Sequence, residues 1–354
     1  MMDSVLVTGG AGFIGGNFVR YFCKREKTNI VILDKLTYAA SLGSIQDVLQ
    51  KDNVYFVRGD IANTELVEHI FEEHSINAVI NFAAESHVDR SILGPEEFID
   101  TNVKGTFNLL EVARARWGPE LDSKRFLHVS TDEVYGTLSP TDPPFDEQTS
   151  YKPNSPYSAS KAASDHLVRA WHHTYDMPVI ITNCSNNYGS WQFPEKLIPL
   201  MILNVIEEKP LPIYGDGRQI RDWLHVNDHC SAIHRVFEQG VVGETYCIGG
   251  NNERANIDIV HAVIRAVDQK LGRPEGCSEK LITHVKDRPG HDRRYAINSG
   301  KLKEKLDWQP SYTFEQAIEE IVTWYIENDE WVNSIRSGDY VKFYQKQYGH
   351  RIED

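Results

Sequence analysis

A glycine-rich turn near the N-terminus sets the strongest limit on the fold. It reads Gly-Gly-Ala-Gly-Phe-Ile-Gly over residues 9–15 and follows directly on the apolar run Val5–Val7. Glycines at this spacing allow a tight turn, let main-chain N–H groups approach a pyrophosphate at a helix N-terminus, and bring the helix close to the strand. A turn needed only for packing would look similar, but the pattern predicts a strand, a turn and a helix that bind a dinucleotide.

Asp34 supports this interpretation through its place in the sequence. It ends the second apolar run, Ile30–Leu33, about twenty residues after the glycines. A carboxylate here accepts hydrogen bonds from a ribose diol and repels a 2′-phosphate, so NAD is favoured over NADP. The alternative, an ordinary aspartate at a strand end, does not account for its register with the glycines. Two further apolar runs, ending at residues 60–61 and 82–86, fit the same cofactor-binding edge.

The first half of the chain alternates short apolar runs with amphipathic segments. The runs are Val5–Val7, Ile30–Leu33, Tyr55–Val57, Ala78–Phe82, Phe126–Val129 and Val179–Thr182. Segments such as Thr64–His74 and Asn102–Arg116 carry apolar residues at helical spacing. This alternation predicts an α/β fold with a Rossmann-type, doubly wound parallel sheet covered by helices on its faces.

After about residue 185 the pattern becomes less regular. Loops rich in proline, glycine and charge interrupt it at residues 187–195, 215–222 and 287–294. We therefore expect an NAD-binding Rossmann domain over residues 1–185 and a smaller C-terminal α/β substrate-binding domain over residues 186–354, with the chain crossing between them. Function is expected in the cleft between the two parts.

The composition argues against several kinds of partner. A net charge of −14 over 354 residues leaves no basic field to attract nucleic acid or an anionic membrane, and no long apolar segment predicts a membrane span. A small anionic ligand is compatible with this charge, because helix N-termini and a few basic side chains bind phosphate locally. The five cysteines are odd in number and lack metal-ligand spacing, which predicts reduced thiols and no metal site. Without a basic or apolar leader at the N-terminus, we expect a cytoplasmic protein.

A tyrosine and a lysine four residues apart form the first candidate catalytic pair. Ser155 and Pro156 have the chemistry of a helix start, which places Tyr157 and Lys161 on one helix face. The ammonium is expected to lower the pKa of the phenol and to reach the nicotinamide ribose. Such pairs also occur on solvated helix faces, but after a dinucleotide fingerprint the pattern indicates a base for a hydroxyl that loses hydride.

Two adjacent carboxylates, Asp132 and Glu133, form the second candidate group. They follow the run Phe126–Val129 through Ser130 and Thr131, so they are expected at the carboxyl edge of the sheet, where ligands bind. An acidic pair can also be a solvated turn. A dehydrogenase or an epimerase needs only the tyrosine base, whereas a consecutive Asp and Glu provide a separate acid and base. That is the equipment for eliminating water.

Nearly the whole chain resembles the dTDP-glucose 4,6-dehydratase family, a nucleotide-sugar branch of the extended short-chain dehydrogenase/reductase superfamily. The discriminating motifs are STDEVYG at residues 130–136 and DRPGHDRRYAI at residues 287–297, since the others are partly shared with related epimerases and decarboxylases. Those others are GGAGFIG at 9–15, DKLTYA at 34–39, AAESHVDRSI at 83–92, SPYSASKAASDHLVRAW at 155–171, NCSNNYG at 183–189, FPEKLIPL at 193–200 and IRDWLHVNDH at 220–229.

The resemblance implies that the chain converts dTDP-glucose to dTDP-4-keto-6-deoxyglucose and water with NAD as cofactor. It assigns Tyr157 as the base for the sugar 4-hydroxyl, supported by Lys161, and Thr131 as a hydrogen-bond partner of the 4-oxygen. It assigns Glu133 to take the C5 proton and Asp132 to protonate the departing 6-hydroxyl, before hydride returns to C6.

The resemblance also assigns the ligand contacts. The NAD contacts fall on Gly9, Gly12, Phe13, Ile14, Gly15, Asp34, Lys35, Leu36, Thr37, Asp60, Ile61, Phe82, Ala83, Ala84, Ser86, Thr101, Tyr157, Lys161 and Asn187. The nucleotide-sugar contacts fall on Ser86, Thr131, Asn186, Lys196, Leu197, Pro212, Ile213, Tyr214, Arg221, Asn256, Asp287, Arg288, Pro289, Gly290 and His291.

The sequence departs from the family pattern in two places. Ser190 stands where the family usually has proline, which is expected to loosen the loop toward Lys196, and the loop between Tyr135 and Tyr157 is short.

The resemblance further implies a homodimer formed through paired helices, to which residues 102–116 and 159–173 contribute.

Alternative functions stay open at this point. A UDP-sugar 4-epimerase or a decarboxylase of the same superfamily would share Tyr157 and Lys161 but have no use for Asp132 as an acid. A non-catalytic NAD-binding sensor would share the fold alone. The sequence leaves open which pathway consumes the product, and the preference for a nucleobase depends on the resemblance.

Overall fold

The computed structural model describes residues 3–336. Its central sheet has seven parallel strands in the order β10-β6-β5-β4-β1-β2-β3. The strands are β1 (Ser4–Thr8), β2 (Asn29–Asp34), β3 (Val54–Arg58), β4 (Ala78–Asn81), β5 (Arg125–Thr131), β6 (Val179–Cys184) and β10 (Thr245–Ile248). The prediction of a doubly wound parallel sheet is confirmed, and each of the six predicted runs lies on a strand. Strand β10 is not among the predicted strands.

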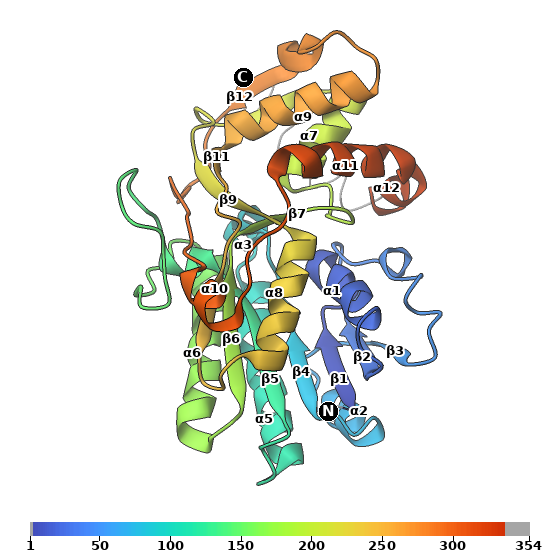
Figure 1. Cartoon of the computed structure of the whole chain (residues 1–354), viewed down its shortest axis with the longest axis vertical. Coiled ribbons are helices and arrows are strands. Elements are labelled where there is room, and N and C mark those ends of the chain that lie inside the picture. The colour runs from blue at the N-terminus through green and yellow to red at the C-terminus, as the bar shows by residue number, and fades with distance from the viewer. Residues whose placement is uncertain (1–2, 337–354) are drawn as a thin grey trace.

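Both faces of this sheet are buried. Val5 and Val7 of β1 pack into one apolar core and Leu6 into another, because successive strand residues point to opposite faces. Covered parallel strands read as continuous apolar runs rather than as an alternating pattern. Helices cover both faces (Figure 1). On one face lie α1 (Phe13–Cys23), α8 (Val226–Gln239) and the short α10 (Gly300–Leu306), and on the other lie α2 (Thr64–Glu73), α5 (Thr106–Trp117) and α6 (Pro156–Tyr175).

Short helices follow several strands at the edge that carries the site. They are α3 (Val88–Leu93), α4 (Glu96–Phe98) and a π-helical turn at Ile99–Gly105 after β4, and 3-10 turns at Leu42–Ser44 after β2 and at Asp132–Tyr135 after β5. A further 3-10 turn, Cys277–Leu281, lies between α9 (Asn256–Lys270) and β12 (Ile282–Val285). The predicted helix Asn102–Arg116 therefore comprises the end of the π-helical turn and most of α5.

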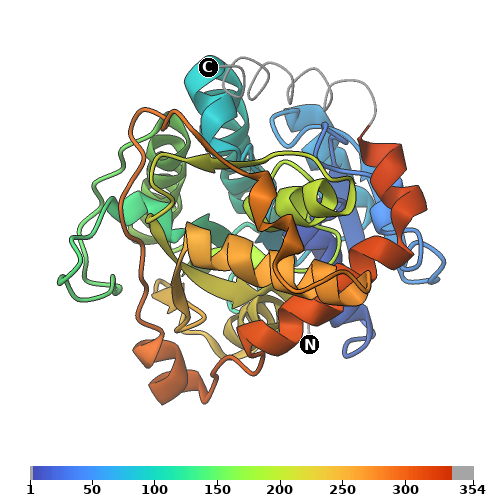
Figure 2. The same cartoon turned by 90° about the horizontal axis from the view of Figure 1, so that it is seen from above.

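A second group of elements lies above the carboxyl ends of the strands (Figure 1), and Figure 2 looks down on it. Its sheets are small, with the orders β11-β9-β7 and β12-β8. The strands are β7 (Asn186–Tyr188), β8 (Leu211–Tyr214), β9 (Ile220–His225), β11 (Glu253–Ala255) and β12 (Ile282–Val285), and the helices are α7 (Leu197–Ile206), α9 (Asn256–Lys270), α11 (Phe314–Glu327) and α12 (Asp329–Ile335). These helices share a core of their own, which includes Met201, Val263 and Ile321.

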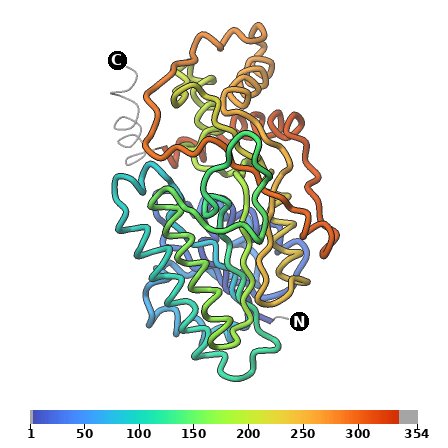
Figure 3. The backbone as a smooth tube through the Cα atoms, turned by 90° about the vertical axis from the view of Figure 1, so that its left-hand side faces the viewer, coloured from blue at the N-terminus to red at the C-terminus, as the bar shows by residue number. Residues whose placement is uncertain are grey.

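The chain crosses between the two groups more than once. After residue 185 it returns to the lower body to form α8, β10 and α10 (Gly300–Leu306), and β10 pairs with β6. Figure 3 shows the blue-to-green first half in the lower part of the molecule and the orange C-terminal elements above it. The predicted boundary between two domains at residue 185 stays a prediction.

Within residues 3–336, no helix is both long and apolar enough to cross a membrane.

Candidate active site

A cavity of about 300 Å³ opens at the carboxyl edge of the sheet, where the two groups of elements meet. It brings together the glycine turn, the acidic pair and the Tyr157–Lys161 pair. All the residues predicted to contact NAD line this cavity except Leu36. Of the residues predicted to contact the nucleotide sugar, four line it: Ser86, Thr131, Asn186 and Lys196.

The glycine turn is shaped by close contacts of the main chain. Gly9 has a φ of +67°, and a Cβ atom there would lie 2.7 Å from the nitrogen of Ala83. A Cβ on Gly15 would lie 2.3 Å from the carbonyl oxygen of Gly9. Helix α1 begins at Phe13 with Gly12 as its N-cap, and no side chain caps its first turn. Main-chain N–H groups at this helix end therefore suit an anionic group.

Asp34 holds the glycine turn against the end of β2. Its Oδ2 accepts a hydrogen bond from the Ala11 N–H at 2.9 Å and its Oδ1 accepts one from the Leu36 N–H at 2.8 Å. Burial raises the pKa of this carboxyl, and the two main-chain hydrogen bonds oppose the shift. Each carboxylate oxygen has a second lone pair, so a ribose diol can still be bound.

The helix that carries the tyrosine and the lysine begins as predicted. Ser155 accepts from the Ser158 N–H in a capping box, and Pro156 follows at the first position. Tyr157 and Lys161 are 8% and 3% exposed and both line the cavity. Their contacts differ from the expectation, because the Lys161 ammonium donates to the carbonyl of Val129 at 2.9 Å.

The expected lowering of the Tyr157 pKa is wrong for this structure. Burial raises the pKa of the phenol well above its usual range, and the carboxyl of Glu133 adds to the shift. The helical spacing indicated an ammonium close enough to lower the pKa of the phenol. In the fold, burial of the phenolate raises this pKa, and burial is the larger of the two effects. The side chain of Thr131 acts in the opposite direction and favours the phenolate.

The acidic pair occupies a short turn at the end of β5. The Thr131 hydroxyl accepts from the Glu133 N–H at 3.2 Å and caps the turn Asp132–Tyr135. Asp132 is 1% exposed, and no described residue donates a hydrogen bond to its Oδ2. Burial raises the pKa of Asp132 well above its usual range, with Glu133 and Asp222 adding to the shift.

Glu133 lies in a different field of charge. Burial raises its pKa too, but Arg288, Arg221 and Lys196 oppose the shift. These cations favour the carboxylate, so Glu133 is the better base of the two and Asp132 the better acid. Two adjacent carboxyl groups are thus prepared for opposite proton transfers.

The cations on this side are held by main-chain oxygens. Lys196 donates to the carbonyl of Ser86 at 3.1 Å. Arg221 is 5% exposed, donates to the carbonyls of Ile220 and Asp292, and stacks on Tyr295 at 4.1 Å. The third cation, Arg288, instead forms an ion pair with Asp89 at 3.7 Å.

The remaining predicted sugar contacts lie outside the lining of the cavity. They are Leu197, Pro212, Ile213, Tyr214, Arg221, Asn256, Asp287, Arg288, Pro289, Gly290 and His291. The side chain of Ile213 packs in the second core, at 2% exposure. The loop 287–291 is organised around Asp287, whose Oδ1 pairs with Nδ1 of His291 at 2.6 Å and accepts from the Arg288 N–H at 2.8 Å. Burial lowers the pKa of His291 to about 4.

The cavity also contains residues that the sequence argument did not assign. Glu195 lies beside Lys196 and accepts hydrogen bonds from the Tyr38 hydroxyl at 3.0 Å and from Nε of Arg90 at 3.2 Å. Outside the lining of the cavity, Asp89 accepts from the Tyr214 hydroxyl at 3.4 Å. Asp89 lies in the motif at residues 83–92 and Glu195 in the motif at residues 193–200. In each motif an acidic residue directly precedes a basic one, and this pairing is the feature of the sequence that could have indicated a role at the site.

The loop that contains Ser190 is anchored from two sides. The Ser190 carbonyl accepts from Nδ2 of Asn17 at 3.0 Å. Trp191 has a φ of +69° and packs against Trp324 and Trp331, with centroid distances of 4.8 and 5.2 Å, while Arg20 covers its ring. Aromatic packing therefore fixes the loop where a proline was expected.

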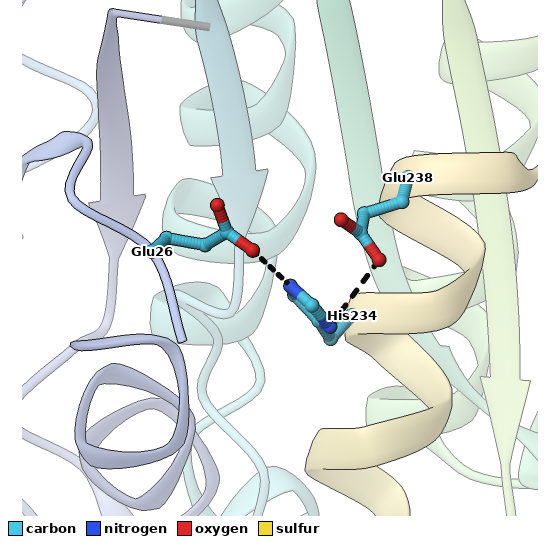
Figure 4. A group of neighbouring side chains, drawn as sticks. All are labelled: Glu26, His234 and Glu238. Carbon is cyan, nitrogen blue, oxygen red and sulfur yellow. Dashed lines mark hydrogen bonds and ion pairs between the residues drawn. The ribbon is translucent and has the colours of Figure 1, made fainter. Parts of the chain in front are cut away.

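One further group of potential metal ligands occurs among the described residues, away from this cavity. Glu26, His234 and Glu238 lie together between the end of α1 and helix α8 (Figure 4). Nε2 of His234 lies 3.1 Å from Glu26 and Nδ1 lies 3.6 Å from Glu238. Each ring nitrogen thus faces its own carboxylate, so the two carboxylates do not converge on one ring nitrogen.

Comparisons with known proteins identify close relatives. A family model described as GDP-mannose 4,6 dehydratase matches residues 6–321. A dTDP-glucose 4,6-dehydratase from Xanthomonas campestris pv. campestris (strain B100) is 56% identical over 344 residues, which cover 96% of this chain and 97% of the relative.

Solved structures of similar proteins match the fold. That of dTDP-glucose 4,6-dehydratase from Bacillus anthracis str. Ames in complex with NAD has a TM-score of 0.84 and 48% identity, and covers 94% of this chain and 99% of its own. That of DesIV, a dTDP-glucose 4,6-dehydratase from Streptomyces venezuelae with NAD and TYD bound, has a TM-score of 0.86 and 41% identity, with the same coverage.

Proposed function

We propose, since the chain belongs to the GDP-mannose 4,6-dehydratase family, that it is an NAD-dependent dTDP-glucose 4,6-dehydratase. This carbon–oxygen lyase converts dTDP-glucose to dTDP-4-keto-6-deoxyglucose and water. The relatives that carry this name align along nearly the whole chain. NAD is the cofactor, and the two similar solved structures contain it.

The residues around the cavity fit NAD. The first turn of α1 offers uncapped N–H groups to a pyrophosphate, and Asp34 offers lone pairs to a ribose diol. When bound, NAD accepts hydride from C4 of the sugar and returns it to C6, so the cofactor is regenerated in each turnover.

The protein supplies the proton transfers. Tyr157 takes the proton of the 4-hydroxyl while Lys161 supports it, and the ketone formed at C4 acidifies the C5–H bond. Glu133 removes the C5 proton, and Asp132 gives its proton to the departing 6-hydroxyl, so that water leaves across C5 and C6. Elimination therefore needs one carboxyl group that is protonated and one that is ionised.

The single observation that carries this proposal is the unequal charge around two adjacent carboxyl groups. Burial raises the pKa of both groups, but three cations oppose the shift at Glu133, whereas at Asp132 two neighbouring carboxyl groups add to it and only Arg221 opposes it among the cations. A UDP-sugar 4-epimerase or a decarboxylase would share the tyrosine base but would gain nothing from a protonated Asp132. A non-catalytic NAD-binding sensor would need neither carboxyl group.

Incubation of the purified protein with dTDP-glucose tests the proposal. We expect a product that is lighter by one water and absorbs in alkali as a 4-keto sugar, and a screen of dTDP-, UDP-, CDP- and GDP-glucose should favour the first. An isomer of unchanged mass would indicate an epimerase. No reaction with any of the four would leave a sensor, or a decarboxylase whose substrate carries a carboxyl group that these four sugars lack. The variant Tyr157→Phe is the control, because it should give no product.

We also propose that the protein works as a cytoplasmic homodimer. Support for the dimer comes from α5 and α6, which expose Phe107 and Tyr175 at 45% and 43%. The ring of Trp171 contacts both of these side chains and makes the patch continuous. Apolar surface of this kind is typical of an interface between protein chains.

A further inference from the structure

Behind Lys161, on the side away from the cavity, His128 and Asp165 form a buried polar pair. His128 belongs to β5 and is 0% exposed, and Asp165 lies one turn after Lys161 on α6 and is 2% exposed. Nε2 of His128 lies 3.4 Å from Nζ of Lys161 and 3.3 Å from Oδ1 of Asp165. Neither residue has a part in the proton transfers described above.

The neighbours of His128 determine which ring nitrogen carries the proton. Asn81 accepts from the Thr8 hydroxyl through its Oδ1 at 2.6 Å, so its Nδ2 faces Nδ1 of His128 at 3.1 Å. Nδ1 is therefore the acceptor, and Nε2 carries the hydrogen, which faces Asp165 and the Ser164 hydroxyl. Burial lowers the pKa of His128 to about 4, with Lys161 adding to the shift, so the ring is neutral near neutral pH.

The carboxyl group of Asp165 is held in place by hydrogen bonds. Its Oδ2 accepts hydrogen bonds from the hydroxyls of Ser130 and Tyr151 at 2.8 and 2.9 Å and from Nδ2 of Asn183 at 3.3 Å. Three donors on one oxygen are the partners that a carboxylate accepts, and they fix its position in the interior.

We propose that Asp165 and His128 are positioning residues for Lys161. Asp165 supplies the buried negative charge that keeps Lys161 an ammonium, and the neutral His128 ring holds that charge at a fixed distance from it. The inference rests on the proposed function, because it concerns the lysine that supports Tyr157. Lys161 in turn donates to the carbonyl of Val129, so the pair fixes both the charge and the place of its ammonium.

The charges around Lys161 determine the direction of the effect. Burial lowers the pKa of Lys161, and the groups that oppose it are Asp165 on α6 and Cys184 on β6. Without the Asp165 charge the ammonium loses its proton at lower pH, and Tyr157 then loses the cation beside it. The alkaline limb of the rate of C4 oxidation should accordingly move to lower pH.

The variant Asp165→Asn tests this, with Asp268→Asn as a matched control. Asp268 is a buried carboxyl on α9 that binds Ser278 and is remote from the site. In single turnovers with dTDP-glucose, the absorbance of reduced nicotinamide reports C4 oxidation at each pH. We expect the alkaline limb to move down by about one unit or more in Asp165→Asn and to stay in place in Asp268→Asn. If a folded Asp165→Asn protein shows the same pH dependence of C4 oxidation as the wild type, the inference is overturned.

A second variant and a second measurement cover the cases in which Asp165→Asn does not fold or the wild-type protein does not oxidise dTDP-glucose. If Asp165→Asn does not fold, His128→Gln takes its place, and an unshifted profile in that variant overturns the inference. If the wild-type protein does not oxidise dTDP-glucose, the proposed function fails, but titration of NAD binding against pH needs no sugar. The pH at which binding weakens should then fall in Asp165→Asn relative to wild type, and an unshifted titration overturns the role of the pair.

Discussion

Asp132 and Glu133 show how much two neighbouring residues can differ. They share one turn capped by Thr131, yet carboxyl groups raise the pKa of Asp132 with Arg221 alone among the cations opposing them, while Arg288, Arg221 and Lys196 all oppose the rise at Glu133. The sequence predicted the pair and its place at the strand end. It did not predict the distribution of charge, because Arg221 and Arg288 come from elements far along the chain.

Replacing Asp132→Asn should separate oxidation from elimination. Tyr157 can still take the C4 hydroxyl proton, whereas the loss of a positioned acid should slow elimination by ~10²–10⁴-fold. Rapid-quench mass spectrometry should show a 4-keto hexose nucleotide that still contains its 6-hydroxyl. Glu133→Gln serves as the matched variant, since it should also stop exchange of the C5 hydrogen with deuterated solvent. Normal formation of 6-deoxy product in Asp132→Asn would eliminate Asp132 as the acid.

Replacing Tyr157→Phe should remove the base and leave the packing in place. The ring of Tyr157 meets Phe98 edge-on at 6.3 Å, and a phenylalanine preserves that contact. We expect C4 oxidation to slow by ~10²–10⁴-fold while NAD binding and the thermal unfolding midpoint stay close to those of the wild type. Rapid formation of reduced nicotinamide in single turnovers of this variant would assign the base to another group.

At the scale of elements, the six predicted strands and the helix start at Ser155 could be taken from the sequence because their signals are local. Each strand is an apolar run, and the helix has its cap and its proline in adjacent positions. Strand β10, Thr245–Ile248, was not predicted because it gains its place by pairing with β6, a contact between segments far apart in the sequence. The Glu195 contacts were also missed, since their partners Tyr38 and Arg90 are distant in sequence.

The turn before α1 gives a prediction at this scale. A Cβ on Gly15 would lie 2.3 Å from the Gly9 carbonyl, so Gly15→Ala must push the helix away from the strand. We expect a loss of ~1–3 kcal/mol in the free energy of unfolding and weaker NAD binding, measured by thermal unfolding and equilibrium titration. Gly94→Ala is the control, because its nearest neighbour would be 4.0 Å away. Equal NAD binding by the two variants would contradict the close-contact account of the turn.

At the scale of the whole molecule, the exposed patch on α5 and α6 tests the proposed dimer. Phe107→Glu places a charge at one end of this patch and should shift the mass in sedimentation from dimer to monomer. Val241→Glu is the control, since Val241 is 61% exposed and lies in the turn after α8. A wild-type protein that sediments as a monomer, or a Phe107→Glu protein that remains dimeric, would rule out this face.

The position of β10 at the edge of the main sheet has a consequence for synthesis. Residues Ser4–Cys184 leave the ribosome before Thr245–Ile248 exists, so β6 is for a time the open edge of a six-stranded sheet. Its unpaired N–H and C=O groups are free to bind another extended chain during that interval. A fragment that stops near residue 185 would keep this edge permanently and should aggregate, however complete its cofactor motifs are. The nascent chain thus depends on its own second half, or on a chaperone, to close the sheet.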